Sequence, residues 1–221
     1  MTAAPAKVAV LASGRGSNLA ALLAARERGD LPVEFVLVGS DKASAGALRL
    51  AEAANIPTLA LDPRSYPDRR AFDLELFQRI AASGAEWLVL AGFMRILDGE
   101  ALRPWVGRII NIHPSLLPKY RGLHTHRRAL EAGDREHGAS VHFVTAELDG
   151  GPVIAQAYLP IEAGDDEQLL AQRLLPLEHR LLPTVLGLLV SGRLRWDGQA
   201  PRFDDQPLAT PLRLGDDGLR P

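Results

Sequence analysis

The chain has 221 residues, of which 47% are hydrophobic and 24% charged, and its formal net charge at pH 7 is −2. This length and apolar content predict one folded domain, with a small appendage at most, and exclude a disordered chain. Cysteine is absent, which excludes disulfide scaffolds, thiolate zinc sites, iron–sulfur clusters and cysteine nucleophiles. The charge balance argues against binding nucleic acid by neutralising its phosphates.

No segment has the pattern of a signal peptide or a membrane span. Residues 1–11 lack a charged, then apolar, then small-residue order, and the apolar run over 181–190 is short and contains a proline. We therefore expect a soluble, cytoplasmic protein without a membrane partner.

The first half of the chain alternates short apolar runs with segments of helical periodicity. The runs at 7–12, 33–38, 87–90 and 108–112 predict buried strands. Leucines at helical spacing predict a helix that stops at Gly29, and similar patterns predict helices over 45–54 and 67–84. Alternation of this kind predicts an α/β fold, a Rossmann-like, doubly wound, mostly parallel sheet with helices on both faces.

The second half changes character after Pro114. A loop reaches about residue 123, a short helix is expected over 124–132, and strands are expected over 139–145 and 152–159. The segment 166–190 has helical periodicity but contains two prolines, so a kink or two separate helices are expected. We expect one domain over 1–197, with halves meeting near residue 107, and an irregular tail over 198–221.

A glycine loop, Ser13-Gly14-Arg15-Gly16-Ser17-Asn18, lies between the first strand and the first helix. Free amides at a helix start attract anions, so a substrate phosphate is one interpretation of this loop. A tight turn capped by Ser17 is another. NAD binding is a third, although Leu19 stands where the dinucleotide fingerprint has its third glycine and Asp41 only loosely matches its acidic residue.

Asn111 and His113 stand at the end of the strand predicted over 108–112, just before Pro114. Residues two apart in a strand share a face, and the carboxyl end of a parallel strand is where α/β proteins bind ligands. The amide can donate to an oxygen that gains negative charge, and the imidazole can donate a proton or stabilise the same oxygen. Alternatively, the pair only satisfies nearby backbone groups.

Asp149 precedes two glycines between the last two predicted strands. An Asp-Gly-Gly sequence is typical of a hairpin turn, and this interpretation stays open. In the functional interpretation, Gly150 and Gly151 let the backbone place a carboxylate in a pocket. There it can orient an imidazole and stabilise the charged form of the ring.

Four further histidines cluster in the sequence. His124 and His126 have the spacing of metal ligands, and His137 and His142 follow. No thiol and no helical His-Glu-His motif accompanies them, so structural hydrogen bonding explains them better than zinc. No metal site is expected.

Four segments together resemble the phosphoribosylglycinamide formyltransferase family, over about residues 7–194. They are Ser13 to Leu19, Leu90 to Leu97, Asn111 to Pro118 and Leu148 to Pro152. The resemblance implies transfer of a formyl group from 10-formyltetrahydrofolate, as co-substrate, to the amine of glycinamide ribonucleotide in purine (IMP) biosynthesis. This reaction requires no metal or NAD. The partners that the resemblance implies are small molecules, and the protein is expected to be a monomer or homodimer.

By position, the resemblance assigns catalysis to Asn111, His113 and Asp149. It assigns the ribonucleotide to the residues Gly16, Ser17, Asn18 and Glu178. It assigns the formylfolate to Arg69, Met94, Arg95, Ile96, Leu97, Asn111, Thr145, Ala146, Glu147, Leu148 and Asp149. The half before residue 107 would hold the ribonucleotide, and the half from 108 to 197 the folate and the catalytic groups. Glu178 follows Pro176, which could bend its helix.

Three rival interpretations remain at this point. Methionyl-tRNA formyltransferase shares the Ser115 to Pro118 run but needs a further carboxyl-terminal domain for RNA. Formyltetrahydrofolate hydrolase has a similar core but an added amino-terminal domain. A nucleotide-binding module without catalysis would rest on the glycine loop alone, and an assay of formyl transfer to glycinamide ribonucleotide distinguishes all of them.

Overall fold

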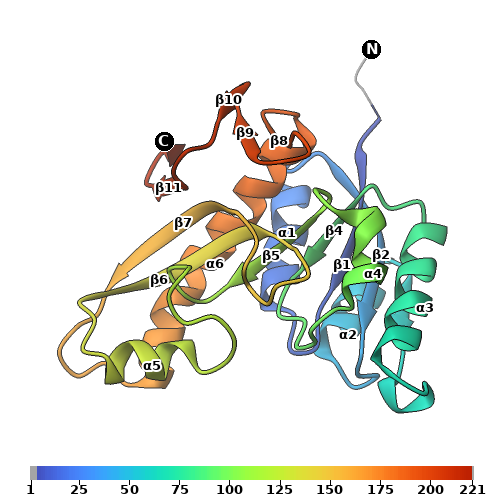
Figure 1. Ribbon diagram of the computed structural model, residues 1–221, viewed down its shortest axis with the longest axis horizontal. Coiled ribbons are helices and arrows are strands. Elements are labelled where there is room, and N and C mark those ends of the chain that lie inside the picture. The colour runs from blue at the N-terminus through green and yellow to red at the C-terminus, as the bar shows by residue number, and fades with distance from the viewer. Residues whose placement is uncertain (1–3, 221) are drawn as a thin grey trace. The chain divides into compact units, whose positions relative to one another are not determined.

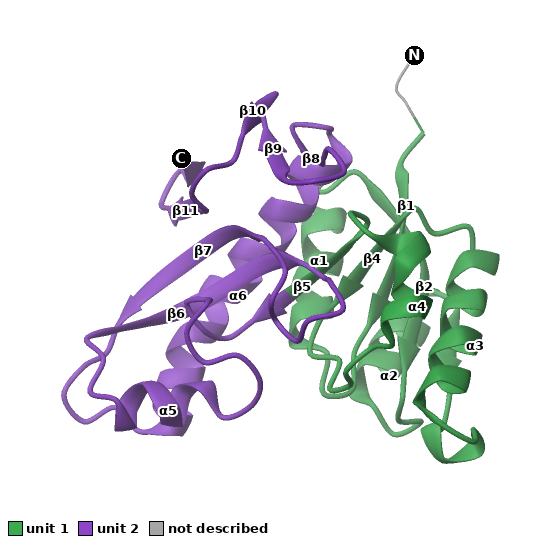
Figure 2. Cartoon of the chain, in the orientation of Figure 1, with its two compact units in different colours: residues 1–111 green, residues 112–221 purple. Residues whose placement is uncertain are grey.

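The computed structural model describes residues 4–220 (Figure 1). The chain forms two compact units, which meet in sequence between Asn111 and Ile112 (Figure 2). Unit 1 is residues 1–111 and unit 2 is residues 112–221.

Unit 1 alternates strands with helices. Its strands are β1 (Ala6–Leu11), β2 (Val33–Ser40), β3 (Thr58–Ala60), β4 (Trp87–Leu90) and β5 (Ile109–His113), the last of which crosses the unit boundary. Its helices are α1 (Ser17–Glu27), α2 (Gly46–Ala53), α3 (Arg69–Ala82) and α4 (Gly99–Leu102), with 3-10 turns η1 (Pro63–Ser65) and η2 (Arg103–Trp105). The predicted alternation is confirmed; β3, only three residues long and largely exposed, was not predicted.

The strands of unit 1 lie in the order β3-β2-β1-β4-β5, and every neighbouring pair is parallel. The chain moves from β1 outward to β2 and β3, then returns to β4 and β5 on the other side. Right-handed crossovers therefore put α1 and α2 on one face of the sheet and α3 on the other. Residues 8–11 of β1 and the next residue, Ala12, are fully buried, as expected for a central strand covered on both faces.

Unit 2 combines one long helix with mostly short strands. Its helices are α5 (Thr125–Glu131) and α6 (Glu167–Val190). Its strands are β6 (Glu136–Phe143), β7 (Val153–Pro160), β8 (Leu194–Trp196), β9 (Pro201–Phe203), β10 (Gln206–Pro207), β11 (Leu212–Gly215) and β12 (Gly218–Arg220). The order β6-β7-β11-β12 forms one sheet segment, with β6 and β7 antiparallel, while β8, β9 and β10 form a separate sheet.

Helix α6 continues through both prolines, so the alternative of two separate helices is wrong, and that of a kink stays a prediction. Each interior proline costs about 3 kcal/mol, because it removes a hydrogen bond and crowds the preceding turn. Leucines on both sides of the prolines face the unit core, among them Leu174, Leu181 and Leu186, all fully buried. Burial of each contributes roughly 1.5–3 kcal/mol, so the apolar face outweighs the two prolines. No helix within residues 4–220 is long and apolar enough to cross a membrane.

The carboxyl-terminal segment is not irregular, contrary to expectation. Its strands are two to four residues long, too short for a periodic pattern to reveal them. Leu212 is fully buried and pairs with Ala155 of β7, so this segment extends the sheet. Asp204 and Asp205 adopt positive φ angles in the β9–β10 turn, a conformation that Asp tolerates better than most residues.

Candidate functional site

In unit 2, the strand β5 ends in a buried imidazole. The His113 side chain is 8% exposed, and its Nε2 lies 3.0 Å from the carbonyl oxygen of Tyr120. A carbonyl only accepts hydrogen bonds, so Nε2 carries the proton of this contact. The other ring nitrogen, Nδ1, lies 3.5 Å from Oδ2 of Asp149. Nδ1 is therefore the ring atom open to a proton exchange.

The Asp149 carboxylate lies between two imidazoles. Its Oδ1 is 3.6 Å from Nε2 of His142, whereas His113 contacts the other oxygen, Oδ2. The backbone N–H of Gly122 donates to Oδ2 at 2.9 Å. The side chain is 9% exposed, and its residue adopts a φ of +46°, a conformation uncommon outside glycine. A carboxylate so buried and so held is typical of a functional site.

The two glycines after Asp149 let its loop approach β6 closely. A Cβ on Gly151 would lie 1.9 Å from the carbonyl oxygen of Phe143, so no side chain fits there. A Cβ on Gly150 would lie 2.3 Å from the Glu147 side chain. The segment does connect the antiparallel strands β6 and β7, as the hairpin interpretation holds. It spans residues 144–152, however, and a simple turn does not account for the buried carboxylate.

Burial and charge act against each other on these groups. Burial lowers the pKa of His113, and the opposing effects of the Tyr120 carbonyl and the Asp149 charge only partly offset it. Burial raises the pKa of Asp149, but His142, His113 and the Gly122 N–H together outweigh burial and leave the pKa below its ordinary value. At neutral pH the ligand-free site therefore pairs an ionised carboxylate with a largely neutral His113 imidazole.

His142 is the site residue that the sequence analysis missed, since it treats this histidine as a structural residue. Its Nδ1 contacts the carbonyl oxygen of Phe143 at 2.9 Å, which turns Nε2 toward Asp149. The available signal was its place near the end of a strand, directly before the loop that carries Asp149.

The loop that supplies Tyr120 is itself tied down. The Tyr120 hydroxyl donates to Asp134 at 2.7 Å, and Lys119 Nζ pairs with the same carboxylate at 2.8 Å. Deeper in the unit, Ser140 Oγ accepts from the N–H of Leu117 and donates to the carbonyl of Ser115. These bonds fix the backbone on which the His113 contact depends.

In unit 1, the glycine loop places Gly16 as the N-cap of α1, with a φ of +85°. No side-chain hydrogen bond caps this end, so the interpretation of Ser17 as a capping residue is wrong. The first turn holds no acidic residue, and its first amides have no carbonyl partner within the helix. A Cβ on Gly16 would lie 2.8 Å from Cα of Ala47, so the glycine also permits close packing on α2.

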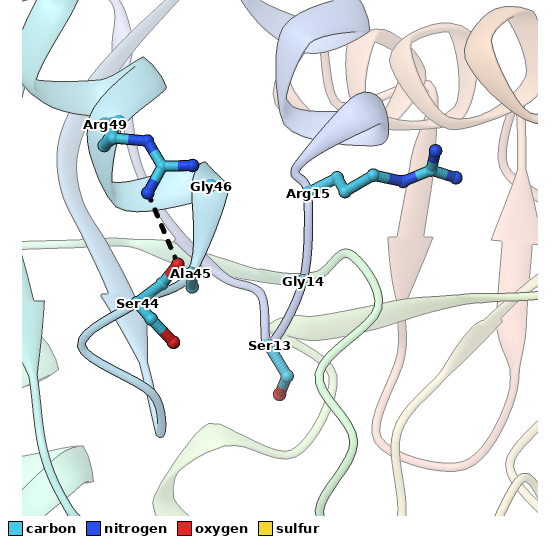
Figure 3. A pocket seen from close by; sticks show the side chains of 7 residues that line it. All are labelled: Ser13, Gly14, Arg15, Ser44, Ala45, Gly46 and Arg49. Atoms are coloured by element: carbon cyan, nitrogen blue, oxygen red, sulfur yellow. Dashed lines mark hydrogen bonds between the residues drawn. The ribbon is translucent and has the colours of Figure 1, made fainter.

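A pocket of about 320 Å³ lies beside this loop. Figure 3 shows the loop residues on one side and the start of α2, with Arg49, on the other. Its lining residues are Ser13, Gly14, Arg15, Ser44, Ala45, Gly46 and Arg49. The residues expected to contact the ribonucleotide, Gly16, Ser17 and Asn18, follow directly in the chain and do not line it.

The segment 94–97 follows β4 in unit 1 and presents apolar side chains to solvent. Met94 is 61% exposed and Ile96 is 48% exposed, whereas Leu97 is buried. The guanidinium of Arg95 lies over the ring of Phe72, 4.7 Å from its centroid. Arg69 is the first residue of α3 and is exposed.

The other expected site residues lie in three places. Residues 145–148 belong to the β6–β7 connection, where Glu147 forms an ion pair with Arg121 and Leu148 is 45% exposed. Asn111 is half-buried in β5 and is paired with Leu90 of β4. Glu178 lies on the buried face of α6. The contacts given above bring His113 and Asp149 together.

Two of the histidines for which structural hydrogen bonding was expected contact each other. His137 Nε2 lies 2.9 Å from His126 Nδ1, with the rings at 70°. In the part of the chain that the structure describes, no group of three or more His, Asp or Glu side chains is arranged to hold a metal ion.

Comparison with known proteins addresses the resemblance directly. The formyl transferase family model matches residues 6–186. The chain belongs to the formyl transferase family. Phosphoribosylglycinamide formyltransferase of Escherichia coli is 47% identical to this formyl transferase over 201 residues, which cover 91% of this chain and 95% of that protein. The trifunctional purine biosynthetic protein adenosine-3 of Gallus gallus is 44% identical over 189 residues, which are 86% of this chain and 19% of that protein.

Solved structures agree with these relatives. The phosphoribosylglycinamide formyltransferase of Coxiella burnetii has a TM-score of 0.89 at 44% identity, covering 93% of this chain and 96% of its own. The glycinamide ribonucleotide transformylase 1 of Symbiobacterium toebii has a TM-score of 0.88 at 42% identity, covering 91% and 95%. The resemblance inferred from four sequence motifs is confirmed, as is the fold class.

Proposed function

We propose that this formyl transferase moves the formyl group of 10-formyltetrahydrofolate to the amine of glycinamide ribonucleotide, a step of purine biosynthesis. The observation that carries the proposal is the Asp149 carboxylate, buried between His113 and His142 in a chain 47% identical to a phosphoribosylglycinamide formyltransferase. A buried carboxylate–imidazole pair is suited to moving a proton during attack of an amine on a carbonyl carbon.

The proposed reaction exchanges one carbon–nitrogen bond for another. The substrate amine bonds to the formyl carbon and loses a proton, the bond from that carbon to the folate nitrogen breaks, and the folate nitrogen gains a proton. When bound, 10-formyltetrahydrofolate supplies the formyl group and this leaving nitrogen. The protein has to stabilise negative charge on the formyl oxygen and to move the proton.

His113 and Asp149 suit these two tasks. His113 is largely neutral without ligand, and negative charge that develops nearby raises its proton affinity. We infer that Nδ1 donates to the formyl oxygen, since Nε2 is held by Tyr120. Asp149 stabilises the charged imidazole and helps to take the proton from the attacking amine. Asn111, on the same side of β5 as His113 by strand alternation, donates its amide N–H to the same oxygen.

The ribonucleotide is assigned to the glycine loop and Glu178. The start of α1 offers amide donors and the positive end of the helix dipole, both of which favour a phosphate. The assignment of Gly16, Ser17 and Asn18 rests on the family resemblance and on this geometry.

The formyl donor is assigned to Arg69, to residues 94–97 and to residues 145–149, together with Asn111. Exposed Met94 and Ile96 offer apolar surface of the kind that an aromatic pterin covers, and Leu148 offers more in unit 2. Arg69, exposed at the start of α3, is available to an acidic group on the donor.

The test is a formyl transfer assay with the purified protein. Tetrahydrofolate release is followed with both substrates, and then without glycinamide ribonucleotide. Release that depends on the ribonucleotide supports the proposal. Equal release without it would identify a hydrolase, and no release would contradict formyl transfer.

A further inference from the structure

Unit 1 contains a carboxylate that the proposed reaction does not use. Asp73 lies on α3 and is fully buried, which is rare for an aspartate unless it has specific partners. Burial raises the pKa of the Asp73 carboxyl, opposed by its hydrogen bond to Asp98 and by the charges of Arg95 and Arg69. Holding a carboxylate in such a place costs free energy, so its contacts show what it stabilises.

One oxygen of this carboxylate binds the segment after β4. Oδ2 of Asp73 accepts a hydrogen bond from the backbone N–H of Asp98 at 2.7 Å. Asp98 in turn caps α4, accepting from the N–H groups of Glu100 and Ala101. Arg95, whose charge favours the ionised Asp73, lies over Phe72, the residue next to Asp73 in α3. Asp73 therefore holds the end of the 94–97 segment.

The beginning of the same segment is held by Ser13. The N–H of Met94 donates to Ser13 Oγ at 2.9 Å, and the N–H of Ser13 donates to the carbonyl of Gly92 at 3.0 Å. Between these two anchors, the Met94 and Ile96 side chains stay exposed while Leu97 is buried. A short loop fixed at both ends in this way presents its apolar side chains in one geometry.

We propose that Asp73 is a positioning residue for the formyl donor. It holds residues 94–97 in their binding conformation through the Asp98 N–H and through the charge of Arg95. This inference rests on the proposed function, which assigns that segment to the donor. Loss of the carboxylate leaves the segment to be ordered at the moment of binding, which weakens donor binding and leaves the chemical step unchanged.

The expected result is a selective change in one Michaelis constant. Asp73→Ala raises the KM for 10-formyltetrahydrofolate by about tenfold or more, with kcat and the KM for the ribonucleotide close to wild type. Asp73→Asn, which keeps an oxygen for the Asp98 N–H but loses the charge, gives a smaller rise. The matched control is Asp166→Ala, which removes a helix-capping carboxylate in unit 2 that accepts from Leu169 at 2.7 Å.

A purely structural role makes a different prediction. The inference is overturned if Asp73→Ala and Asp166→Ala lower the melting temperature by similar amounts and give the same KM for the formyl donor. Should Asp73→Ala fail to fold, Asp98→Pro and Asp98→Ala replace it. Asp98 has a φ of −71°, which proline can adopt, so the pair differs in the N–H that Asp73 binds. The inference requires a higher donor KM for Asp98→Pro than for Asp98→Ala, and equal values overturn it.

Wild-type protein separates this inference from the proposed function. Failure of wild type to transfer formyl groups, and to bind 10-formyltetrahydrofolate in a titration, refutes the proposed function. Wild-type transfer combined with an unchanged donor KM in the variants refutes only the role of Asp73.

Discussion

The two units build their candidate sites from different atoms. In unit 1, the glycine loop offers backbone amides at the start of α1, and its key residue, Gly16, has no side chain. In unit 2, the site consists of side chains, with Asp149 held between His113 and His142. All six histidines of the chain fall in unit 2, and unit 1 has none.

This difference separates binding from chemistry. Backbone amides do not titrate in the physiological range, so a site built from them binds an anion at any pH at which the anion is charged. Imidazoles change charge near neutral pH and can exchange protons, and an ionised carboxylate beside them can accept one. Substitutions in the glycine loop should therefore change substrate affinity, and those at Asn111, His113 and Asp149 should change kcat and its pH profile.

The largest effect is expected for Asp149→Asn. The amide keeps an acceptor for the Gly122 N–H, so the fold survives, but the negative charge that favours a protonated His113 is lost. We expect kcat to fall by roughly 10²–10⁴. Steady-state kinetics and a melting curve measure the two quantities. A near wild-type rate would reduce Asp149 to a turn residue.

Next in size is the coupling between Asn111 and His113. Each alanine variant should lower kcat by roughly 10²–10³, since each removes a donor to the same developing charge. The double variant should lose far less than the product of the two single losses. Strictly multiplicative losses would show that the two side chains act on different atoms.

A smaller, pH-dependent effect concerns the stability of unit 2. Burial, with the neighbouring His126, lowers the pKa of His137 from 6.5 to about 4. The unfolded chain therefore binds the proton more readily than the folded one. The buried, neutral His137 ring therefore contributes fully to the free energy of unfolding above pH 6.5. This contribution is lost as the pH falls toward 4. At pH 4.5 the loss should be about 2 kcal/mol.

Urea unfolding of wild type and His137→Gln at pH 7 and pH 4.5 measures this pH-dependent part of the free energy of unfolding. The variant should lose about 2 kcal/mol less than wild type on acidification. An equal loss in both proteins would place the acid sensitivity in other groups.

The smallest effect is expected in the glycine loop. Gly16→Ala forces a Cβ to within 2.8 Å of Ala47 at a φ of +85° and should raise the ribonucleotide KM about tenfold, with an unchanged pH profile. Gly14→Ala is the control, because nothing lies within 4 Å of its added Cβ. Removing the phosphate from the substrate should weaken wild-type binding as well. An equal rise in the donor KM, or a shifted pH profile, would contradict the division between the units.

Much of the fold could be predicted because its elements carry strong local signals. The spacing of apolar residues alone predicts the strand β1 and the helix α1. The length of α6 could not be predicted from local sequence, since Pro176 and Pro183 oppose a continuous helix. Packing of the apolar face of the helix against residues distant in the sequence stabilises it. The strands after residue 200 were missed because pairing with β7, a long-range contact, stabilises them.

In the candidate site, too, local signals predicted some residues and long-range packing decided the others. Strand alternation predicted the place of His113, and the glycines predicted the tight approach of Asp149. Nothing local to His142 indicates that its ring meets that carboxylate, because the contact depends on how the 144–152 loop folds back. The burial that keeps the His113 ring largely neutral in the ligand-free protein is likewise a property of the packed unit, and no local sequence pattern indicates it.

The pairing of β11 with β7 has a consequence for self-association. An open β7 edge would present unpaired N–H and C=O groups, a template onto which another chain could add a strand. Leu212 and Arg213 occupy that edge, the guanidinium of Arg213 lies over Tyr158, and Arg180 fastens the next turn through the carbonyl of Gly215. The new outer edge is the three-residue β12, which ends in Arg220 beside Asp217. Beyond the paired part of β7, the outer edge is thus short and charged, a kind of edge that is a poor template for a strand of another chain.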